Sequence, residues 1–400
     1  MFNKFPVEET RVRLEYLFSS LPIFWLFTGH LWFKDSSKTL VVITVLFLLT
    51  SVFFCNFQIV KNNLKSRKFL WVIFCVAAYG VISKEIHGYS NKELRVLFCI
   101  TIYFSLVSDR FITFTLSKIH WLLFLASTTT LVYSIFQTYI LDVERRLWPL
   151  NPIPLTTVSA GVAVCALAYL FKSKEPVEKT VLSITLLFGL STILISETRS
   201  SLLALFAGGF IILCLQPRKA KIKPRTIFYV ILAVLIIGFT LKDSVQSRYH
   251  STLDEIESIK SGNLNTSIGF RFQLWESTLH TPISLFGLGD EHISFRESLY
   301  QSKIIEKSAV YWDHYHNQFL TSLYIYGVIG LMSIISLLVI PLIFITKNTN
   351  KEPIIALVVV YFISSLTDIP FNQSISLGFY LAMTLIILNR SIIRQGRSYD

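Results

Sequence analysis

The chain has 400 residues, of which 52% are hydrophobic and 14% aromatic, and its mean hydropathy is +0.56. This composition exceeds what a soluble globular domain carries and indicates a polytopic membrane protein. The net charge of +12 would attract anionic lipid headgroups. No patch interleaves basic residues with exposed aromatics, so we expect no nucleic acid partner.

Apolar runs that are long enough, or nearly long enough, to cross about 30 Å of hydrocarbon recur throughout the chain. Two of these runs, 69–83 and 95–108, are short for a full span, so about ten or eleven helices would also fit. The sequence predicts an all-α polytopic membrane protein with about 12 transmembrane helices, in the runs 14–33, 40–60, 69–83, 95–108, 119–141, 156–171, 180–196, 201–215, 226–241, 317–346, 354–367 and 374–389.

The positions of Lys and Arg predict the orientation. Most of the 37 basic residues fall in segments on the same side as the N-terminus, and few fall in the alternate short loops. Because basic residues favour the cytoplasmic side of short loops, we expect cytoplasmic termini and an external long loop. The predicted organisation is 1–241 as transmembrane helices 1–9, 242–316 as one large periplasmic loop with short helices, and 317–400 as transmembrane helices 10–12 with a cytoplasmic tail.

The long loop has the pattern of an ordered cap rather than of a linker. Ser251–Ser261 predicts a short amphipathic helix, and Ile268–Leu279 predicts a second one with an apolar stripe. Gly287-Leu288-Gly289 then predicts a tight turn.

His316-Asn317 is followed by nine residues and then by Gly327-Val328-Ile329-Gly330, where the polar loop enters an apolar run. Eleven residues at 3.6 per turn make almost three turns, so a continuous helix would place His316 and Gly327 on one face. Gly330 would lie one turn further along that face. We therefore expect a neighbouring helix to pack closely below the histidine.

Three groups at the outer face of the membrane could handle charge: Arg199 in a tight hairpin, Arg271 on an amphipathic segment, and His316. A guanidinium binds phosphate oxygens as a bidentate fork, and imidazole, whose pKa in water is about 6.5, accepts a proton near neutral pH. Taken singly, each residue also fits a plainer role. Arg199 could anchor the hairpin at the interface, Arg271 could be a surface charge, and His316 could belong to an aromatic belt.

Other kinds of site fit less well. Asp313, His314 and His316 have no second cluster nearby in the sequence to complete a metal shell, so we expect no metal and no cofactor. No G-x-S-x-G nucleophile elbow occurs, and the Gly287 turn is too short for a dinucleotide fingerprint. The five cysteines lie in apolar runs and predict packing roles.

Motifs in the second half of the chain resemble those of the O-antigen ligases of Gram-negative bacteria and of the superfamily that these share with O-antigen polymerases. The resemblance covers roughly residues 195–345, and the first half is similar only in hydropathy. The motifs are Glu197-Thr198-Arg199-Ser200-Ser201, Arg271-Phe272-Gln273-Leu274-Trp275, Pro282-Ile283-Ser284-Leu285-Phe286-Gly287-Leu288-Gly289, and His316-Asn317 with Gly327 and Gly330.

The resemblance implies a metal-independent glycosyltransferase of the GT-C type in the Gram-negative inner membrane, with its active site facing the periplasm. It would transfer polysaccharide from undecaprenyl diphosphate to a sugar of lipid A-core, completing lipopolysaccharide. The resemblance further implies that Arg199 and Arg271 bind the diphosphate and that His316 is the catalytic residue on the acceptor side.

The chemistry of these residues predicts an inverting transfer in which His316 is the general base, or in which it only orients the acceptor. Gly327 and Gly330 are expected to be structural. Further candidate contacts to sugars or core phosphates are Trp275, Asp290, His314 and Asn317, together with Glu291, His292 and Trp312.

Three rival functions remain. An O-antigen polymerase would use the same donor, but such polymerases typically have two sizeable periplasmic loops, whereas this sequence predicts one. A protein O-oligosaccharyltransferase usually carries a further C-terminal region. A lipid-linked glycan flippase or other transporter would explain the hydropathy, but not the capped loop, and we would expect inverted repeats or buried charges in mid-span. The sequence leaves the oligomeric state, the acceptor sugar, the repeat unit and the linkage open.

Overall fold

The computed structural model describes residues 5–54, 57–87, 90–216, 242–346 and 350–396. Within these ranges every regular element is a helix, so the predicted all-α class is confirmed. Five of the described helices are long and apolar enough to span a membrane, and a bent pair of helices would make a sixth. The five are α2 (Ser36–Phe54), α4 (Phe69–His87), α7 (Ile119–Ile135) with the turn η2 (Phe136–Ile140), α8 (Pro152–Leu170) and α9 (Pro176–Ile195).

Three further apolar helices in the described ranges are shorter than a full span. The predicted run 226–241 lies outside the described residues, so the full number of spans remains a prediction. The shorter apolar helices are α10 (Arg199–Leu215), α17 (Gly327–Ile343) and the first part of α19 (Ser374–Gly396).

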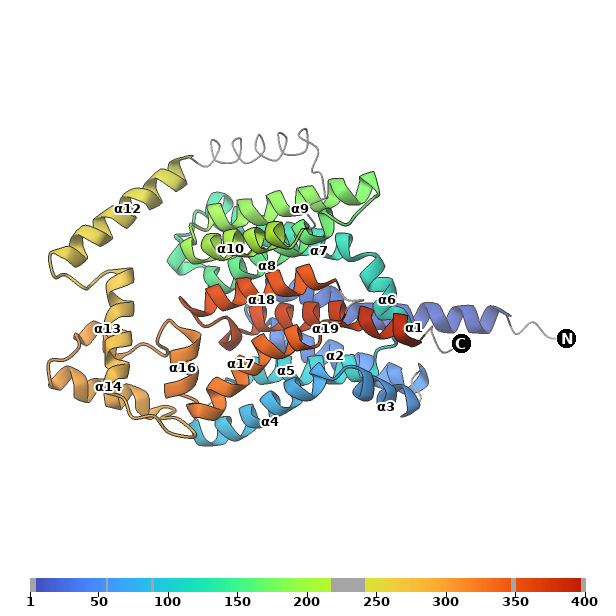
Figure 1. The fold of residues 1–400 in the computed structure, drawn as a ribbon, viewed down its shortest axis with the longest axis horizontal. Coiled ribbons are helices and arrows are strands. Elements are labelled where there is room, and N and C mark those ends of the chain that lie inside the picture. The colour runs from blue at the N-terminus through green and yellow to red at the C-terminus, as the bar shows by residue number, and fades with distance from the viewer. Residues whose placement is uncertain (1–4, 55–56, 88–89, 217–241, 347–349, 397–400) are drawn as a thin grey trace.

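The apolar helices form a bundle along the long axis of the molecule, and a separate group of helices caps one end of it (Figure 1). The start of α1 (Phe5–Phe27) and the end of α19 lie at the opposite end. The cap and the chain termini therefore lie on opposite sides of the bundle. The cap helices are α12 (Lys242–Lys260), α13 (Ser267–Leu279), α14 (Glu291–Gln301) and α15 (Lys307–Val310).

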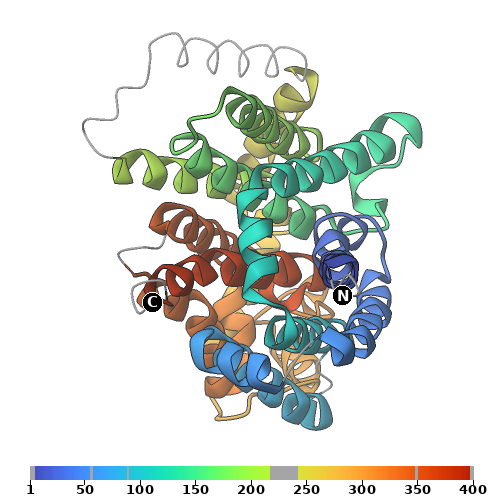
Figure 2. The same cartoon turned by 90° about the vertical axis from the view of Figure 1, so that its right-hand side faces the viewer.

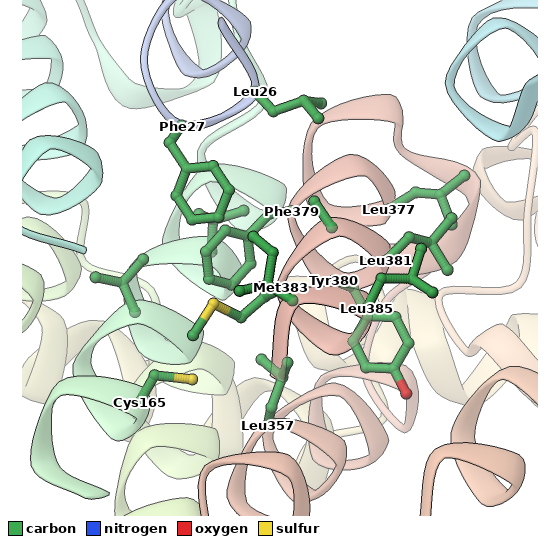
Figure 3. Packing of buried hydrophobic residues seen from close by; sticks show 14 of the residues in the cluster. Leu26, Phe27, Cys165, Leu357, Leu377, Phe379, Tyr380, Leu381, Met383 and Leu385 are labelled. Atoms are coloured by element: carbon green, nitrogen blue, oxygen red, sulfur yellow. The ribbon is translucent and has the colours of Figure 1, made fainter. Parts of the chain in front are cut away.

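Helix α8 is the centre of the bundle because small residues allow its neighbours to approach closely. It contacts α9, α10 and α18 (Lys351–Ser365), and it is buried along most of its length. A Cβ atom added at Gly161 would lie 2.9 Å from the ring of Phe379, and close packing of this kind is how helices associate within membranes. Phe379 and Met383 of α19, Leu357 of α18 and Cys165 of α8 meet in this core (Figure 3).

Two predicted spans have bounds that differ from those of the described helices. The run 40–60 covers α2, described to Phe54, and the start of the amphipathic helix α3 (Phe57–Ser66), with residues 55–56 outside the described ranges. The run 95–108 becomes α5 (Asn91–Leu106), which turns through 106° into α6 (Asp109–Ser117). Figure 2 shows α6 lying across the end of the bundle.

The buried Arg67 explains the bend between α5 and α6. Its guanidinium donates to the carbonyl oxygens of Phe104 and Val107, which the bend removes from the helix, and it pairs with Asp109 at 2.6 Å. Ser108 caps the new helix by accepting a hydrogen bond from the Phe111 N–H group.

The predicted continuous helix over 317–346 is wrong. The structure has α16 (Gln318–Tyr324), then a break, and then α17, and His316 precedes α16 instead of lying on it. His316 and Gly327 therefore share no helix face. Asn317 is the N-cap, since its side chain accepts hydrogen bonds from the N–H groups of Phe319 and Leu320.

The break between α16 and α17 is where the glycine turn of the cap docks. Leu288 and Gly289 donate to the carbonyls of Tyr324 and Ile325, at 2.8 and 2.9 Å. Val328, at the start of α17, donates to the carbonyl of Ser284 at 3.1 Å. These bonds satisfy the backbone groups that the helix ends leave free, so the break is stable without a continuous helix.

Gly287 and Gly327 are required because two backbones meet with no room for side chains. Both have positive φ, +85° and +74°, and a Cβ at Gly287 would lie 2.3 Å from the Ile325 carbonyl oxygen. A Cβ at Gly330 would lie 2.5 Å from the Cβ of Tyr326. Gly327 thus packs against the glycine turn of the cap, and Gly330 packs against residues at and before the break between α16 and α17. The sequence instead predicted that a separate neighbouring helix would pack against them.

We expect Gly287→Ala to destabilise the full-length protein by about 2 kcal/mol or more, because it combines a left-handed backbone conformation with a backbone clash. Gly262→Ala is the matched control, because Gly262 has φ +86° but nothing within 4 Å of an added Cβ. Thermal unfolding in detergent micelles measures both variants. If the two variants lose equal stability, the docking of the glycine turn contributes nothing to the free energy of unfolding.

Candidate active site

His316 lies in a tightly held loop between α15 and α16. Its φ is +48°, a conformation that residues other than glycine rarely adopt and that often marks a functional site. The neighbouring Tyr315 is fixed twice, since its N–H donates to Thr321 Oγ1 at 3.1 Å and its carbonyl accepts from Trp275 Nε1 at 3.0 Å. Together with the Asn317 cap, these bonds offset the backbone strain and fix the direction of the imidazole.

A carboxylate from a distant part of the chain lies beside the imidazole. Asp368, in the turn between α18 and η4 (Pro370–Asn372), places Oδ1 3.8 Å from His316 Nδ1 and 3.7 Å from His314 Nε2. The ring centroids of His314 and His316 are 4.4 Å apart, and Trp312 packs edge-on against His316 at 4.7 Å. The site is therefore a cluster of two imidazoles and one carboxylate beneath an indole ring.

The surroundings of His314 and Asp368 set the charge states of these two groups. Burial, reinforced by the neighbouring His316, lowers the pKa of His314 to about 4, so that this ring is neutral at physiological pH. Burial alone would raise the pKa of Asp368, but its contact with His316 and the proximity of His314 hold that pKa below its usual value. Asp368 is thus a carboxylate facing His316 Nδ1, an arrangement that leaves Nε2 for another partner.

The two predicted arginines come to the same end of the bundle from different elements. Arg199 begins α10, just after a hairpin in which Glu197 has φ +52°, and its Nη2 pairs with Glu255 Oε1 at 2.7 Å. Arg271 lies on α13 and donates from Nη1 to the carbonyl and hydroxyl oxygens of Ser267.

The electrostatics of Arg271 indicate which charged groups lie near it. Burial lowers the pKa of Arg271, the nearby carboxylates of Asp368 and Glu255 raise it, and the Arg199 guanidinium lowers it. Arg199, Arg271 and the His316–Asp368 pair therefore lie within electrostatic reach of one another.

Several buried polar atoms at this site have no hydrogen-bond partner within the described part of the chain: Arg199 Nε, Arg271 Nε, Glu255 Oε2 and His316 Nδ1. Buried polar atoms of folded proteins nearly always have partners. Unpaired donors on two cations are expected where an anionic ligand binds.

Sequence reasoning missed the other residues that complete this site. Asp368 lies just beyond the predicted span 354–367, and Glu255 lies on the predicted amphipathic helix Ser251–Ser261, and neither position suggests a role at this site. Arg145, in η3 (Arg145–Leu147), donates from Nη2 to Thr198 Oγ1 at 3.5 Å and so lies beside Arg199. The buried Arg296 supports the histidine loop, because its guanidinium donates to the Ala309 and Trp312 carbonyls. No local motif marks these positions.

The predicted contact residues divide into two groups. Trp275, His314, Trp312 and Asn317 all contact or fix the His316 loop, and the amide of Asn317 also donates to the Leu366 carbonyl at 3.3 Å. Asp290, Glu291 and His292 lie at the start of α14, and none of the contacts described for the chain joins them to Arg199, Arg271 or His316. His292 Nδ1 contacts the Gly289 carbonyl at 2.5 Å, and the His292 ring lies 6.4 Å from the ring of Tyr315 in the His316 loop.

The cluster of His314, His316 and Asp368 also has the composition of a metal site. One ligand atom from each residue lies within 4.8 Å of the others, and two imidazoles with one carboxylate suit divalent transition metals. The positive charge of Arg271 beside Asp368 opposes a bound cation.

We therefore expect activity to survive metal removal. Excess EDTA should leave the transfer rate of the purified protein within about twofold of its original value, because guanidiniums can stabilise a developing negative charge without a metal. Loss of activity that Zn²⁺ or Mn²⁺ restores would contradict this expectation.

The apolar bundle, the ordered cap and the charged cluster define a helical membrane protein with a polar site at one end of its bundle. Residues 184–335 match a family model described as O-antigen ligase. Over these residues the match agrees with the resemblance predicted from the motifs. The family covers O-antigen ligases and related polymerases, which supports an enzymatic, glycosyltransferase-like activity in general.

The matched stretch contains Arg199, Glu255, Arg271 and His316, whereas Arg145 and Asp368 lie outside it. A curated protein of Haemophilus influenzae, described as uncharacterized, is 30% identical over 139 residues. That alignment covers 32% of this chain and 34% of the relative, so the chain spans about a third of the length of the curated relative that it matches.

Proposed function

We propose that the protein is an O-antigen ligase, which transfers polysaccharide from undecaprenyl diphosphate to a sugar hydroxyl of lipid A-core. The observation that carries the proposal is the gathering of Arg199, Arg271 and the His316–Asp368 pair at the capped end of the bundle. Two cations suit a diphosphate, and an imidazole held by a carboxylate suits a hydroxyl that must lose a proton.

On the donor side, Arg199 and Arg271 stabilise the leaving group. The bond between the anomeric carbon and the phosphate oxygen breaks, and negative charge accumulates on the diphosphate. Guanidinium groups bind phosphate oxygens bidentately, and fixed cations in a partly buried site stabilise developing charge more than water does. No metal ion takes part in the proposed mechanism.

On the acceptor side, His316 accepts the proton through Nε2 while Asp368 faces Nδ1. The acceptor oxygen forms a bond to the anomeric carbon in line with the departing diphosphate, which inverts the configuration at that carbon. The hydroxyl proton passes to the imidazole and the bonding electrons leave with the diphosphate, so the step balances. An anionic Asp368 stabilises the imidazolium that results.

Both substrates carry lipids, so the proposed site lies at a membrane surface. The apolar bundle would sit in the Gram-negative inner membrane, with the cap and active site in the periplasm and both termini in the cytoplasm. The position of the cap opposite the chain ends supports this orientation (Figure 1).

Deleting the gene in its host and separating the lipopolysaccharide on a gel tests the proposal. We expect lipid A-core without polysaccharide, accumulation of long lipid-linked polymer, and recovery when the gene is restored. A single repeat unit on the core would instead indicate a polymerase. Lipid-linked glycan that stays on the cytoplasmic side would indicate a flippase, and unchanged lipopolysaccharide would contradict all three functions.

A further inference from the structure

Glu255 is the only acid on α12 whose described contacts reach the proposed diphosphate site. Its Oε1 lies 2.7 Å from Arg199 Nη2, and its side chain is only 15% exposed. It also raises the pKa of the Arg271 guanidinium, so its charge is felt at both arginines. The carboxylate therefore contacts Arg199 and lies within electrostatic reach of Arg271.

The second oxygen of this carboxylate is poorly satisfied. Glu255 Oε2 is buried and has no hydrogen-bond partner in the described ranges, and neither has the Nε atom of Arg199 or of Arg271. A carboxylate that evolved only to anchor an arginine is expected to form a bidentate pair, which uses both oxygens. The present contact instead leaves a buried polar atom without a described partner on both the carboxylate and the guanidinium.

The helix that carries Glu255 is held loosely. Helix α12, the first helix of the cap (Figure 1), touches α9 and α13 and leaves Tyr249, Leu253 and Ile256 exposed. A segment with few buried apolar contacts moves at a low free-energy cost. Breaking the Arg199–Glu255 pair therefore does not require unpacking the core.

We propose, building on the proposed function, that Glu255 occupies the position of the donor diphosphate in the ligand-free protein and that the diphosphate displaces it. A diphosphate diester brings two negative charges to Arg199 and Arg271, and a carboxylate in the same space would repel them. The two anions bind the same guanidinium fork in turn, so they compete.

This competition has a consequence for turnover. The donor binds only to protein in which Glu255 has left Arg199, so the apparent affinity for the donor falls as the fraction of protein with the Arg199–Glu255 pair rises. The affinity for the undecaprenyl diphosphate product falls in the same way. Return of Glu255 to Arg199 then helps the product to leave, a step that often limits the rate of enzymes. Glu255 thus lowers the affinity of the site for the donor and for the diphosphate product, and it prevents the product from remaining bound and blocking the site.

The sign of one mutational effect tests the proposal. Farnesyl diphosphate serves as the probe, with binding measured by calorimetry on the full-length protein in detergent micelles. We expect Glu255→Gln to bind it about tenfold more tightly than the wild type, because the substitution removes the competing charge and keeps the shape. Glu257→Gln, at an exposed position of the same helix, should bind within about twofold of the wild type.

The outcomes separate this proposal from the proposed function. Weaker binding by Glu255→Gln would mean that Glu255 positions Arg199, and unchanged binding would mean that it does not compete; either result overturns the proposal. Arg199→Gln reports on the function itself, because it should weaken binding about tenfold. If Arg199→Gln binds as the wild type does, the diphosphate site is wrong.

Hydrogen exchange on the wild-type protein gives a second readout that needs no variant. Addition of farnesyl diphosphate should increase amide exchange in α12, which loses its contact with Arg199, and decrease it in α13, which carries Arg271. Increased protection of α12 on binding would contradict displacement of Glu255.

Discussion

His316→Ala is expected to lower the rate of glycan transfer by about 10²- to 10⁴-fold, the range over which a positioned acid or base accelerates a reaction. The imidazole is held by the Asn317 cap, the tethered Tyr315 and the facing Asp368, so its loss removes the proton acceptor and leaves the loop in place. Initial rates of transfer to lipid A-core, measured on purified protein, give the change.

The control for this variant is His280→Ala, because His280 is exposed at the end of α13. It should retain the full rate. Burial lowers the pKa of His314 to about 4, so this residue does not titrate near neutral pH. His314→Gln should therefore leave the pH dependence of the rate near neutrality unchanged. A correctly inserted His316→Ala protein with an undiminished rate would remove His316 from the mechanism.

Arg271→Gln is expected to lower kcat/KM by about 10²- to 10³-fold, the usual effect of deleting one donor that stabilises a developing oxyanion. Arg271→Lys should recover part of this loss, because an ammonium keeps the charge but not the fork. The same pair of substitutions at Arg199 should behave similarly, and the double variant should lose less than the product of the two effects, since both residues act on one leaving group.

Arg146→Gln provides the control for the arginine variants, because its side chain is 87% exposed and contacts only Glu144, at 3.8 Å, among the pairs described for it. It should leave kcat/KM within about twofold of the wild type. Full activity of Arg271→Gln would exclude a role for this guanidinium at the leaving group.

The sequence alone was enough to single out Arg199, Arg271 and His316, because they are unusual residues in recognisable local contexts, and the chemistry proposed for them stays a prediction. It could not predict Asp368 or Glu255 as their partners. An Asp beside a span end and a Glu on a polar helix are common, and only the fold brings them to the imidazole and the guanidinium. Arg145 was overlooked for the same reason.

Hydropathy predicted the helical class but not where helices break. An apolar run reads the same whether it is one helix or two, and the division at Gly327 depends on a glycine turn that lies far away in the sequence. The bend after α5 likewise depends on Arg67, a residue from a different loop. Periodicity reports burial along a single segment, whereas these breaks are made by contacts between segments.

Transfer by the purified full-length protein in proteoliposomes tests the central claim most directly. The assay contains undecaprenyl-diphosphate-linked polysaccharide, lipid A-core and excess EDTA. We expect polysaccharide joined to lipid A-core with inverted anomeric configuration, and loss of that product in Arg199→Gln, Arg271→Gln and His316→Ala. Undiminished transfer in all three variants, or transfer only when a divalent metal is added, would contradict a site in which two guanidiniums and an imidazole carry the reaction.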